Sequence, residues 1–217
     1  MDTGTGFAVI LDIDGTLIEA YEQLFKDCCR TAQKLGLRAP SRQEFLAVLP
    51  LPWAQLLNTL WPDISVEAFN EQFKEQPAKA VPGARRVILG LKKKGYFLAI
   101  ISNREWGSLC VRMDQVKMSL DIFDYVQAVG DFEFAKPDPR VFNRALTVAS
   151  KKGIPRSRVV YVGDTLLDYE AAKGAGIMFV AVLTGGTTRE QFMAAGLDEA
   201  FILNSVKDLP DFLAEKK

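Results

Sequence analysis

Histidine does not occur at any of the 217 positions of this chain. Ser-His-Asp and Cys-His nucleophilic systems are therefore excluded, and so are metal sites that depend on histidine ligands. Any acid–base chemistry must use carboxylates, lysine, tyrosine or cysteine. A bound divalent cation would rest mainly on oxygen ligands, which favours Mg²⁺ over Zn²⁺.

The sequence also has no excess of one charge, no long apolar run and no even number of cysteines. The 27 Lys and Arg equal the 27 Asp and Glu, whereas a mainly electrostatic nucleic-acid binder usually carries a basic surplus. No stretch approaches the roughly 20 apolar residues that span a bilayer, and the N-terminus lacks the pattern of a secretory signal. Cys28, Cys29 and Cys110 lack metal-site spacing, which indicates reduced thiols in a reducing compartment. We therefore expect a cytoplasmic protein without a nucleic-acid or membrane partner.

The spacing of the apolar residues, which make up 48% of the chain, predicts two regions of different architecture. Roughly residues 19–81 show helical spacing and contain no convincing strand. After residue 82, strands alternate with helices, which implies right-handed crossovers and a mostly parallel sheet. The predicted strands cover about residues 7–12, 96–101, 125–129, 159–162, 177–182 and 199–203.

Two carboxylates, one residue apart, follow the first predicted strand. The apolar run 7–11 continues as Asp-Ile-Asp-Gly-Thr over residues 12–16. In extended backbone, residues i and i+2 point to the same side, so Asp12 and Asp14 are aimed at one small volume. Like charges held that close are costly unless a proton or a cation separates them. A strand that ends in an ordinary polar turn would show similar residues, because Asp and Gly favour turns.

Further polar residues follow the other central strands. Ser102 and Asn103 come directly after the second strand, and Asp164 and Asp168 come after the fourth. Lys136 stands between them in the chain, just before a predicted helix. Ligands of parallel α/β sheets bind at the carboxyl ends of the strands. These side chains are therefore expected to gather at one edge of the sheet.

Several of these residues also have a plainer interpretation. Lys136 could be a solvated lysine before a helix, and Ser102 or Asp164 could cap the helices that follow them. A later helix is expected to begin with a capping box of Thr187 and Glu190.

The segments DIDGT, ISN, KPDP and GDTLLD, in this order, resemble the four motifs of the haloacid dehalogenase superfamily. The resemblance covers almost the whole chain and is to the phosphoglycolate phosphatase-like branch, whose helical (C1-type) cap follows the first motif. It implies a Rossmann-like α/β core of residues 1–18 and 82–217, with a parallel sheet sandwiched by helices, and an inserted all-helical cap domain of residues 19–81. It also implies Mg²⁺-dependent hydrolysis of a small phosphate monoester, phosphoglycolate-like or a sugar phosphate, through an aspartyl-phosphate intermediate.

The same resemblance implies roles for the acidic residues and the lysine. Asp12 would be the nucleophile, Asp14 the acid–base group, and Lys136 the point charge that offsets Asp12 and the phosphate. Mg²⁺ would be held by Asp12, the backbone carbonyl of Asp14 and Asp164. Asp168 would either ligate the metal, directly or through water, or orient the site.

Other residues would then contact the substrate. Ser102, together with backbone N–H groups near Gly15 and Asn103, would hold phosphoryl oxygens. Thr16 stands where sugar-phosphate mutases of this fold usually have valine, which favours a phosphatase. Trp53 in the predicted cap could stack on a substrate or belong to the cap core.

Two other functions are compatible with these residues. One is an intramolecular phosphotransferase, a phosphosugar mutase of the same fold. The other is a non-catalytic relic that binds a phosphorylated ligand or a protein, which the intact acidic residues oppose. The expected partner is a small phosphorylated metabolite, and the protein is expected to be a monomer or a homodimer.

Overall fold

The chain falls into two compact units, each of which is described by itself. The computed structural model describes residues 6–49, 53–74, 76–130 and 133–216. One unit comprises Met1–Glu19 and Ala78–Lys217, and the other comprises Ala20–Pro77. The assignment of the second unit as a cap domain remains a prediction.

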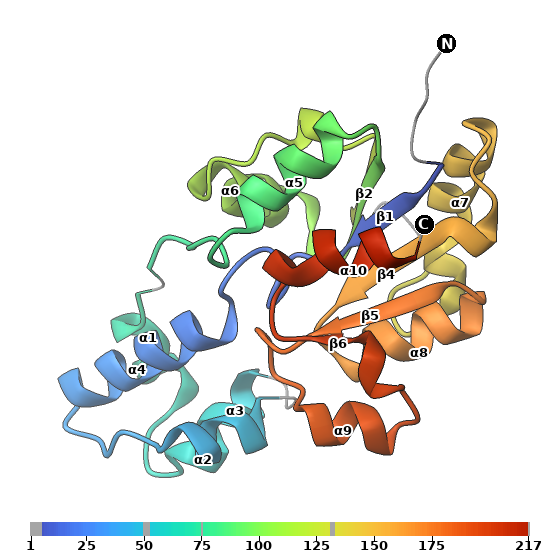
Figure 1. Cartoon of the computed structure of the whole chain (residues 1–217). Helices are drawn as coiled ribbons and strands as arrows, with labels where there is room; N and C mark the ends of the chain where they lie inside the picture. The colour runs from blue at the N-terminus through green and yellow to red at the C-terminus, as the bar shows by residue number, and fades with distance from the viewer. Residues whose placement is uncertain (1–5, 50–52, 75, 131–132, 217) are drawn as a thin grey trace. The chain divides into compact units, whose positions relative to one another are not determined.

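The larger unit is built on a six-stranded sheet in the order β3-β2-β1-β4-β5-β6 (Figure 1). All neighbouring strands pair in parallel, and β1 lies between β2 and β4, with Ala8 opposite both Phe97 and Val159. The prediction of a parallel α/β fold is therefore confirmed. The strands are β1 (Ala8–Leu11), β2 (Phe97–Glu105), β3 (Tyr125–Val129), β4 (Val159–Gly163), β5 (Met178–Val182) and β6 (Ile202–Leu203).

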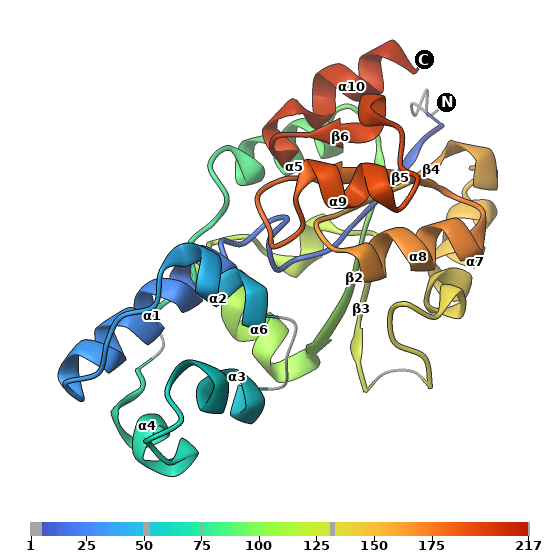
Figure 2. The ribbon, with the colours of Figure 1, turned by 90° about the horizontal axis from the view of Figure 1, so that it is seen from below.

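Helices cover both faces of this sheet. Alternate residues of a strand point to opposite faces, so Val9 and Leu11 join one apolar cluster whereas Ala8 and Ile10 join another. The helices are α5 (Ala84–Lys93), α6 (Trp106–Gln115), α7 (Asn143–Lys151), α8 (Leu166–Ala175), α9 (Arg189–Ala194) and α10 (Leu209–Glu215). Side chains of α5, α6 and α10 fill the cluster of Val9, and those of α7, α8 and α9 fill the cluster of Ala8. Figures 1 and 2 show these helices around the sheet. Burial on both faces explains why the strands read as continuous apolar runs.

The smaller unit contains four described helices around its own apolar cluster. Phe45, Phe69 and Trp61 are the large side chains of this cluster, which also includes Cys28. Burial raises the pKa of the Cys28 thiol to about 12, so this cysteine packs as an inert apolar group. The helices are α1 (Tyr21–Lys34), α2 (Arg42–Val48), α3 (Trp53–Leu60) and α4 (Val66–Gln72).

Two local details differ from the sequence-based expectation. Helix α9 is capped by Thr188, whose hydroxyl accepts from the Gln191 N–H while the Gln191 side chain accepts from the Thr188 N–H. The box expected at Thr187 was wrong by one residue, because both threonines have Glu or Gln three positions later and either satisfies the pattern. Strand β6 is shorter than predicted, since residues 199–201 form a turn of 3₁₀ helix.

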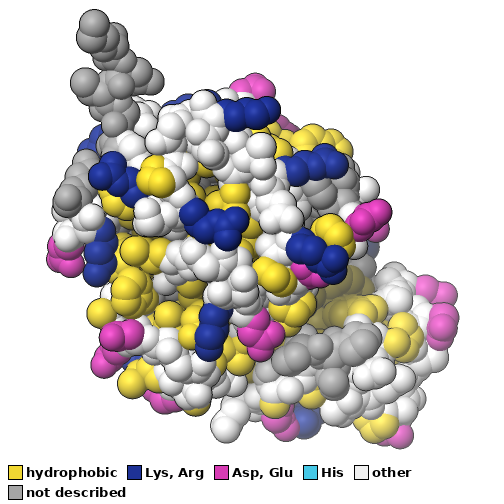
Figure 3. All heavy atoms as spheres, turned by 90° about the vertical axis from the view of Figure 1, so that its right-hand side faces the viewer, with side chains coloured by type: hydrophobic (Ala, Val, Ile, Leu, Met, Phe, Trp, Pro, Cys, Tyr) yellow, Lys and Arg dark blue, Asp and Glu magenta, His cyan; other side chains and the backbone are white. Residues whose placement is uncertain are grey.

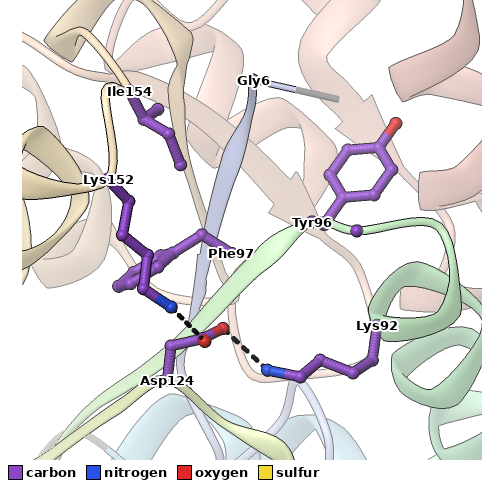
Figure 4. A pocket seen from close by; sticks show the side chains of 8 residues that line it. Gly6, Lys92, Tyr96, Phe97, Asp124, Lys152 and Ile154 are labelled. Atoms are coloured by element: carbon purple, nitrogen blue, oxygen red, sulfur yellow. Dashed lines mark hydrogen bonds and ion pairs between the residues drawn. The ribbon is translucent and has the colours of Figure 1, made fainter. Parts of the chain in front are cut away.

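A hollow of about 350 Å³ lies where the strands begin, at the amino end of the sheet (Figure 4). Asp124 lies between Lys92 and Lys152 there, at 2.9 and 2.7 Å from their ammonium nitrogens, and also accepts from the Leu98 N–H at 2.9 Å. This ion-pair cluster joins α5, β2 and the end of α7.

On the face drawn in Figure 3, the basic and acidic side chains of the described residues are interspersed, so neither sign of charge dominates that face. No described helix combines the length and the apolar character that crossing a membrane requires.

Candidate active site

The two acidic residues that follow β1, Asp12 and Asp14, contact different partners. The Asp12 N–H donates to the Val162 carbonyl at 2.9 Å, which extends the pairing with β4 by one residue and leaves Asp12 6% exposed. Asp12 lies in a group of carboxylates with Asp164 and Asp168, whose ligand oxygens are within 4.8 Å of one another. The Asp14 carboxylate is held by Arg104 instead, with two nitrogen–oxygen distances of 2.8 Å.

Lys136 forms the centre of the buried site. Its ammonium nitrogen lies 2.8 Å from Asp12 Oδ1, 2.6 Å from Asp168 Oδ1 and 3.0 Å from the Tyr161 hydroxyl. A lysine ammonium has three N–H donors, and these three contacts use all of them. Burial alone would lower the pKa of Lys136, but the two carboxylates outweigh it and raise that pKa. Lys136 is therefore a buried, charged lysine, and the alternative of a solvated lysine is excluded.

Asp168 is saturated with hydrogen bonds. Its Oδ1 accepts from Lys136 and, at 2.7 Å, from the Tyr161 hydroxyl. Its Oδ2 accepts from the Thr165 N–H at 3.0 Å and the Thr165 hydroxyl at 2.5 Å. A carboxylate offers about four lone-pair sites, so no site is left for a cation unless one of these bonds breaks. Burial would raise the pKa of Asp168, but the charge of Lys136 and these hydrogen bonds outweigh it and lower that pKa.

Asp164, in contrast to Asp168, has hydrogen-bonding capacity left over. It is fully buried, its Oδ1 accepts from the Thr16 hydroxyl at 3.4 Å, and its Oδ2 has no hydrogen-bond partner among the described residues. Burial raises the pKa of Asp164 well above its ordinary value, and the neighbouring carboxylates raise it further. Asp164 does not cap the following helix, because Thr165 does so with its own side chain. An unsatisfied carboxylate oxygen beside other carboxylates is a place that a cation would stabilise.

The same environment acts on Asp12. Burial raises the pKa of Asp12 to about 7, although Lys136 opposes this rise, and Asp168 adds to it. The ionised form that a nucleophile needs is therefore favoured by additional positive charge next to Asp12.

Two glycines leave room for the Asp164 carboxylate. A Cβ atom at Gly15 or at Gly185 would overlap its atoms. Gly15 also has a positive φ of 77°, which other residues adopt only with strain. The Thr184 hydroxyl donates to the Gly15 carbonyl at 2.5 Å and joins the two glycine segments.

Ser102 and Asn103 lie at the carboxyl end of β2, beside the lysine. The Asn103 side chain accepts from the Lys136 N–H at 2.9 Å and donates to the Lys136 carbonyl at 3.0 Å. This pair of bonds fixes the backbone that carries the lysine. Ser102 is 5% exposed, and its hydroxyl accepts from the Arg104 N–H at 3.2 Å, so it does not cap α6, whose cap residue is Glu105.

Trp53 belongs to the smaller unit and makes its contacts there. Its indole nitrogen donates to Asn70 at 2.9 Å, and its ring packs on Phe69 and Phe73 with centroid distances of 6.1 and 5.2 Å. Its role in substrate binding remains a prediction.

Three residues of this site were not predicted from the sequence. Tyr161 lies inside an apolar strand and Thr165 inside the GDTLLD segment, where neither stands out. Arg104 follows the ISN segment directly, and its position next to that segment was the available signal.

Comparison with known proteins identifies the family. Residues 9–182 match the family model of the haloacid dehalogenase-like hydrolases. The chain belongs to this family. Within it, the chain is 28% identical over 193 residues to a phosphoglycolate phosphatase of Pseudomonas fluorescens, a match that covers 82% of this chain and 69% of the relative. The haloacid dehalogenase-like chain is therefore a hydrolase.

Two further similarities extend over nearly the whole chain. A pyrophosphatase of Halalkalibacterium halodurans is 23% identical over 219 residues, which cover 96% of this chain and 97% of the relative. A crystal structure of a Thermotoga maritima protein, provisionally described as a β-phosphoglucomutase, has a TM-score of 0.73 and 24% identity and covers 96% of this chain and 99% of that one. The latter similarity shows the shared fold.

Proposed function

We propose that this hydrolase is a Mg²⁺-dependent phosphatase that cleaves a small phosphate monoester through an aspartyl-phosphate on Asp12. The observation that carries the proposal is the juxtaposition of Asp12, a charged lysine 2.8 Å away and a buried Asp164 oxygen without a partner. Attack on a phosphate dianion requires a nucleophilic carboxylate, a fixed positive charge and an oxygen ligand that is available to a divalent cation.

The residues present fit a hard divalent cation. Asp164 Oδ2 is a buried acceptor with no described partner, and the two glycines next to it keep its surroundings clear. Asp12, the Asp14 carbonyl and Asp164 would hold the ion, all through oxygen. Saturation of Asp168 supports an orienting role for that residue rather than direct ligation. Bound Mg²⁺ would supply positive charge to the phosphoryl oxygens during transfer.

The chain's own groups account for the two half-reactions. The Asp12 carboxylate attacks phosphorus, the bond from phosphorus to the ester oxygen breaks, and Asp14 gives a proton to the leaving oxygen. Water then attacks the aspartyl-phosphate, Asp14 takes a proton from that water, and the Asp12 carboxylate leaves with its electron pair. Inorganic phosphate is the second product.

Lys136 offsets the negative charge that Asp12 and the substrate bring together. Since its three donors are all engaged, a contact with a phosphoryl oxygen would replace one of them. The longest of the three, to the Tyr161 hydroxyl, involves the neutral partner and is the one we expect to give way. Ser102 and the backbone N–H groups near Gly15 and Asn103 complete the phosphoryl site.

The names of the relatives guide the choice of substrate class. Phosphoglycolate and a sugar phosphate are the monoesters that we expect this hydrolase to act on, and pyrophosphate, an anhydride, is added because of the name of the Halalkalibacterium halodurans relative. A mutase remains a second candidate, because the structural neighbour from Thermotoga maritima carries that description. A cytoplasmic location and a monomeric or homodimeric state stay predictions.

Phosphate release from these compounds tests the proposal. We expect the wild-type protein with Mg²⁺ to release inorganic phosphate, a chelator to abolish the release, and Asp12→Asn to lose it while its circular dichroism spectrum is retained. Asp138→Asn is the matched control, since Asp138 caps the turn before α7 and pairs with Arg140, and in the described network its carboxylate contacts none of the site residues. Near-normal turnover by Asp12→Asn would refute the role of Asp12 as the nucleophile. An isomerised sugar phosphate without phosphate release would indicate a mutase.

A further inference from the structure

Arg104 grips both oxygens of the proposed acid–base residue. Its Nε lies 2.8 Å from Asp14 Oδ2 and its Nη2 lies 2.8 Å from Asp14 Oδ1. This is the parallel two-bond geometry with which a guanidinium group binds carboxylates and phosphates. Both side chains are about one quarter exposed, 24% for Arg104 and 23% for Asp14, so solvent reaches this pair. It differs in this from the buried lysine cluster next to it.

The plane of the guanidinium group is fixed from the protein side. The Arg104 Nη1 donates to the Ser108 hydroxyl at 2.8 Å, in the first turn of α6. The Arg104 backbone N–H donates to the hydroxyl of Ser102, which is expected to bind phosphoryl oxygens. Arg104 is thus an oriented anion receptor located directly beside the expected phosphoryl site.

The observed pairing restricts the chemistry expected of Asp14. Each Asp14 oxygen accepts one bond from Arg104 and keeps a second lone pair, but the two parallel bonds hold the carboxylate in one orientation. A rotation of Asp14 toward the ester oxygen, and then toward water, would break one or both of these bonds. If the pairing simply broke, two charge-assisted hydrogen bonds would be lost. If another anion took the place of Asp14, the guanidinium group would keep two such bonds.

We propose that Arg104 determines substrate specificity by binding a second anionic group of the substrate, which replaces the carboxylate of Asp14. This inference rests on the proposed phosphatase function and narrows its substrate class. The substrate would be a phosphate ester or anhydride with a carboxylate or second phosphoryl group close to the oxygen that leaves. The second group has to be close because Asp14, which serves that oxygen, is the direct neighbour of Arg104. A phosphate ester without such a group leaves Asp14 held by Arg104.

The relatives support this class independently of the geometry. Phosphoglycolate has a carboxylate one carbon from its ester oxygen, and pyrophosphate has a second phosphoryl group on its bridging oxygen. These are the compounds that the names of a Pseudomonas fluorescens relative and a Halalkalibacterium halodurans relative contain.

A pair of substrates that differ only in the second group tests the proposal. The measured quantity is the ratio of kcat/KM for 2-phosphoglycolate to kcat/KM for 2-hydroxyethyl phosphate, in which a hydroxymethyl group replaces the carboxylate. We expect this ratio to favour 2-phosphoglycolate in the wild-type protein and to fall by about tenfold or more in Arg104→Gln, since hydrogen bonds between charged groups are lost. Arg104→Lys retains the charge without the paired donors and should give an intermediate ratio.

A matched control separates this role from the general effect of removing an arginine. Arg38 grips both oxygens of Glu44 at 2.9 Å in the smaller unit, and we expect Arg38→Gln to leave the ratio unchanged. A loss of Asp14 positioning alone would lower both kcat/KM values equally in the Arg104 variants. An unchanged ratio in these variants would overturn the proposal while the phosphatase stands, as would a wild-type protein without preference. Phosphate release by the wild-type protein from a sugar phosphate only, and from neither of these two compounds, would also overturn the proposal while the phosphatase stands. Absence of phosphate release from every compound named under the proposed function would instead contradict that function.

Discussion

Tyr161 donates its hydroxyl hydrogen to Asp168 at 2.7 Å and accepts from Lys136 at 3.0 Å. Its ring is packed against Phe142 and Phe179, with centroid distances of 4.8 and 6.1 Å, inside the sheet–helix layer. Burial raises the pKa of Tyr161 well above its ordinary value, and the charges of Asp168 and Asp12 add to this effect. The hydroxyl is therefore a neutral donor and acceptor that joins the lysine to its orienting carboxylate.

Removal of this hydroxyl should impair turnover more than substrate binding. In Tyr161→Phe the ring packing remains, but Asp168 loses the Tyr161 hydroxyl as a donor, and this loosens the carboxylate that orients Lys136. We expect kcat to fall about tenfold, since one hydrogen bond to a charged group is worth roughly 1.5–3 kcal/mol, while KM changes little. Steady-state kinetics measure both constants. Tyr169→Phe is the control, because Tyr169 lies in the same apolar cluster without contact to Lys136 in the described network. Wild-type kcat in Tyr161→Phe would show that the hydroxyl is dispensable.

Mg²⁺ should stabilise the folded protein through Asp164. A ligand that binds only the folded state adds about 2.7 kcal/mol at a concentration of 100 times its Kd, so the melting temperature should rise with added Mg²⁺. In Asp164→Asn this rise should largely disappear. Without metal, the variant should be no less stable than wild type at neutral pH, because it replaces a carboxylate whose pKa is raised by burial. Thermal unfolding with Mg²⁺ and with chelator measures both effects, and an equal Mg²⁺-induced rise in the variant would remove Asp164 from the metal site.

Gly185 and Gly90 should respond in opposite directions to the same substitution. A Cβ at Gly185 would overlap the buried Asp164 carboxylate, so Gly185→Ala should lower the free energy of unfolding by about 1–3 kcal/mol and weaken the stabilisation by Mg²⁺. A Cβ at Gly90 in α5 meets nothing within 4 Å, so Gly90→Ala should raise the free energy of unfolding by about 0.5–1 kcal/mol. Urea unfolding distinguishes the two. Similar values for both variants would mean that the space beside Asp164 is not restricted.

The ion-pair cluster at Asp124 should make stability depend on pH. Burial would raise the pKa of Asp124, but hydrogen bonds from Lys152, the Leu98 N–H and Lys92 outweigh it and lower that pKa. A carboxyl group with a lowered pKa in the folded state contributes stability above its ordinary pKa of about 3.9, and this contribution is lost as the pH falls below that value.

Asp124→Asn measures this contribution directly. We expect the variant to lose about 1–2 kcal/mol of unfolding free energy at pH 7, since both lysines are partly exposed and solvent screens the pairs. The difference from wild type should shrink when urea unfolding is repeated at about pH 3. A difference that stays constant between the two pH values would show that the charge of Asp124 contributes nothing. Asp121→Asn, on the exposed turn before β3, is the control.

Most secondary structure was predictable because its signals are local. The strand Tyr125–Val129 has the predicted bounds, since its apolar residues and the glycine that follows them lie within a few positions in the chain. The positions of Asp12, Lys136 and Asp164 were equally predictable, because each directly follows a buried strand or precedes a helix at the carboxyl edge of the sheet.

The partner of each side chain was decided only in three dimensions. The sequence placed Asp14 beside Asp12, but strand order brought Arg104, 90 positions away, to its carboxylate. The sequence likewise left Asp168 between two roles, and its four hydrogen bonds, which only the fold shows, support the orienting role that we propose. By itself, the amino-acid order determined which chemical groups arrive at the sheet edge, because strand and helix signals are short-range. Which donor satisfies which acceptor depends on distances between segments far apart in the chain, and only the packed fold sets those distances.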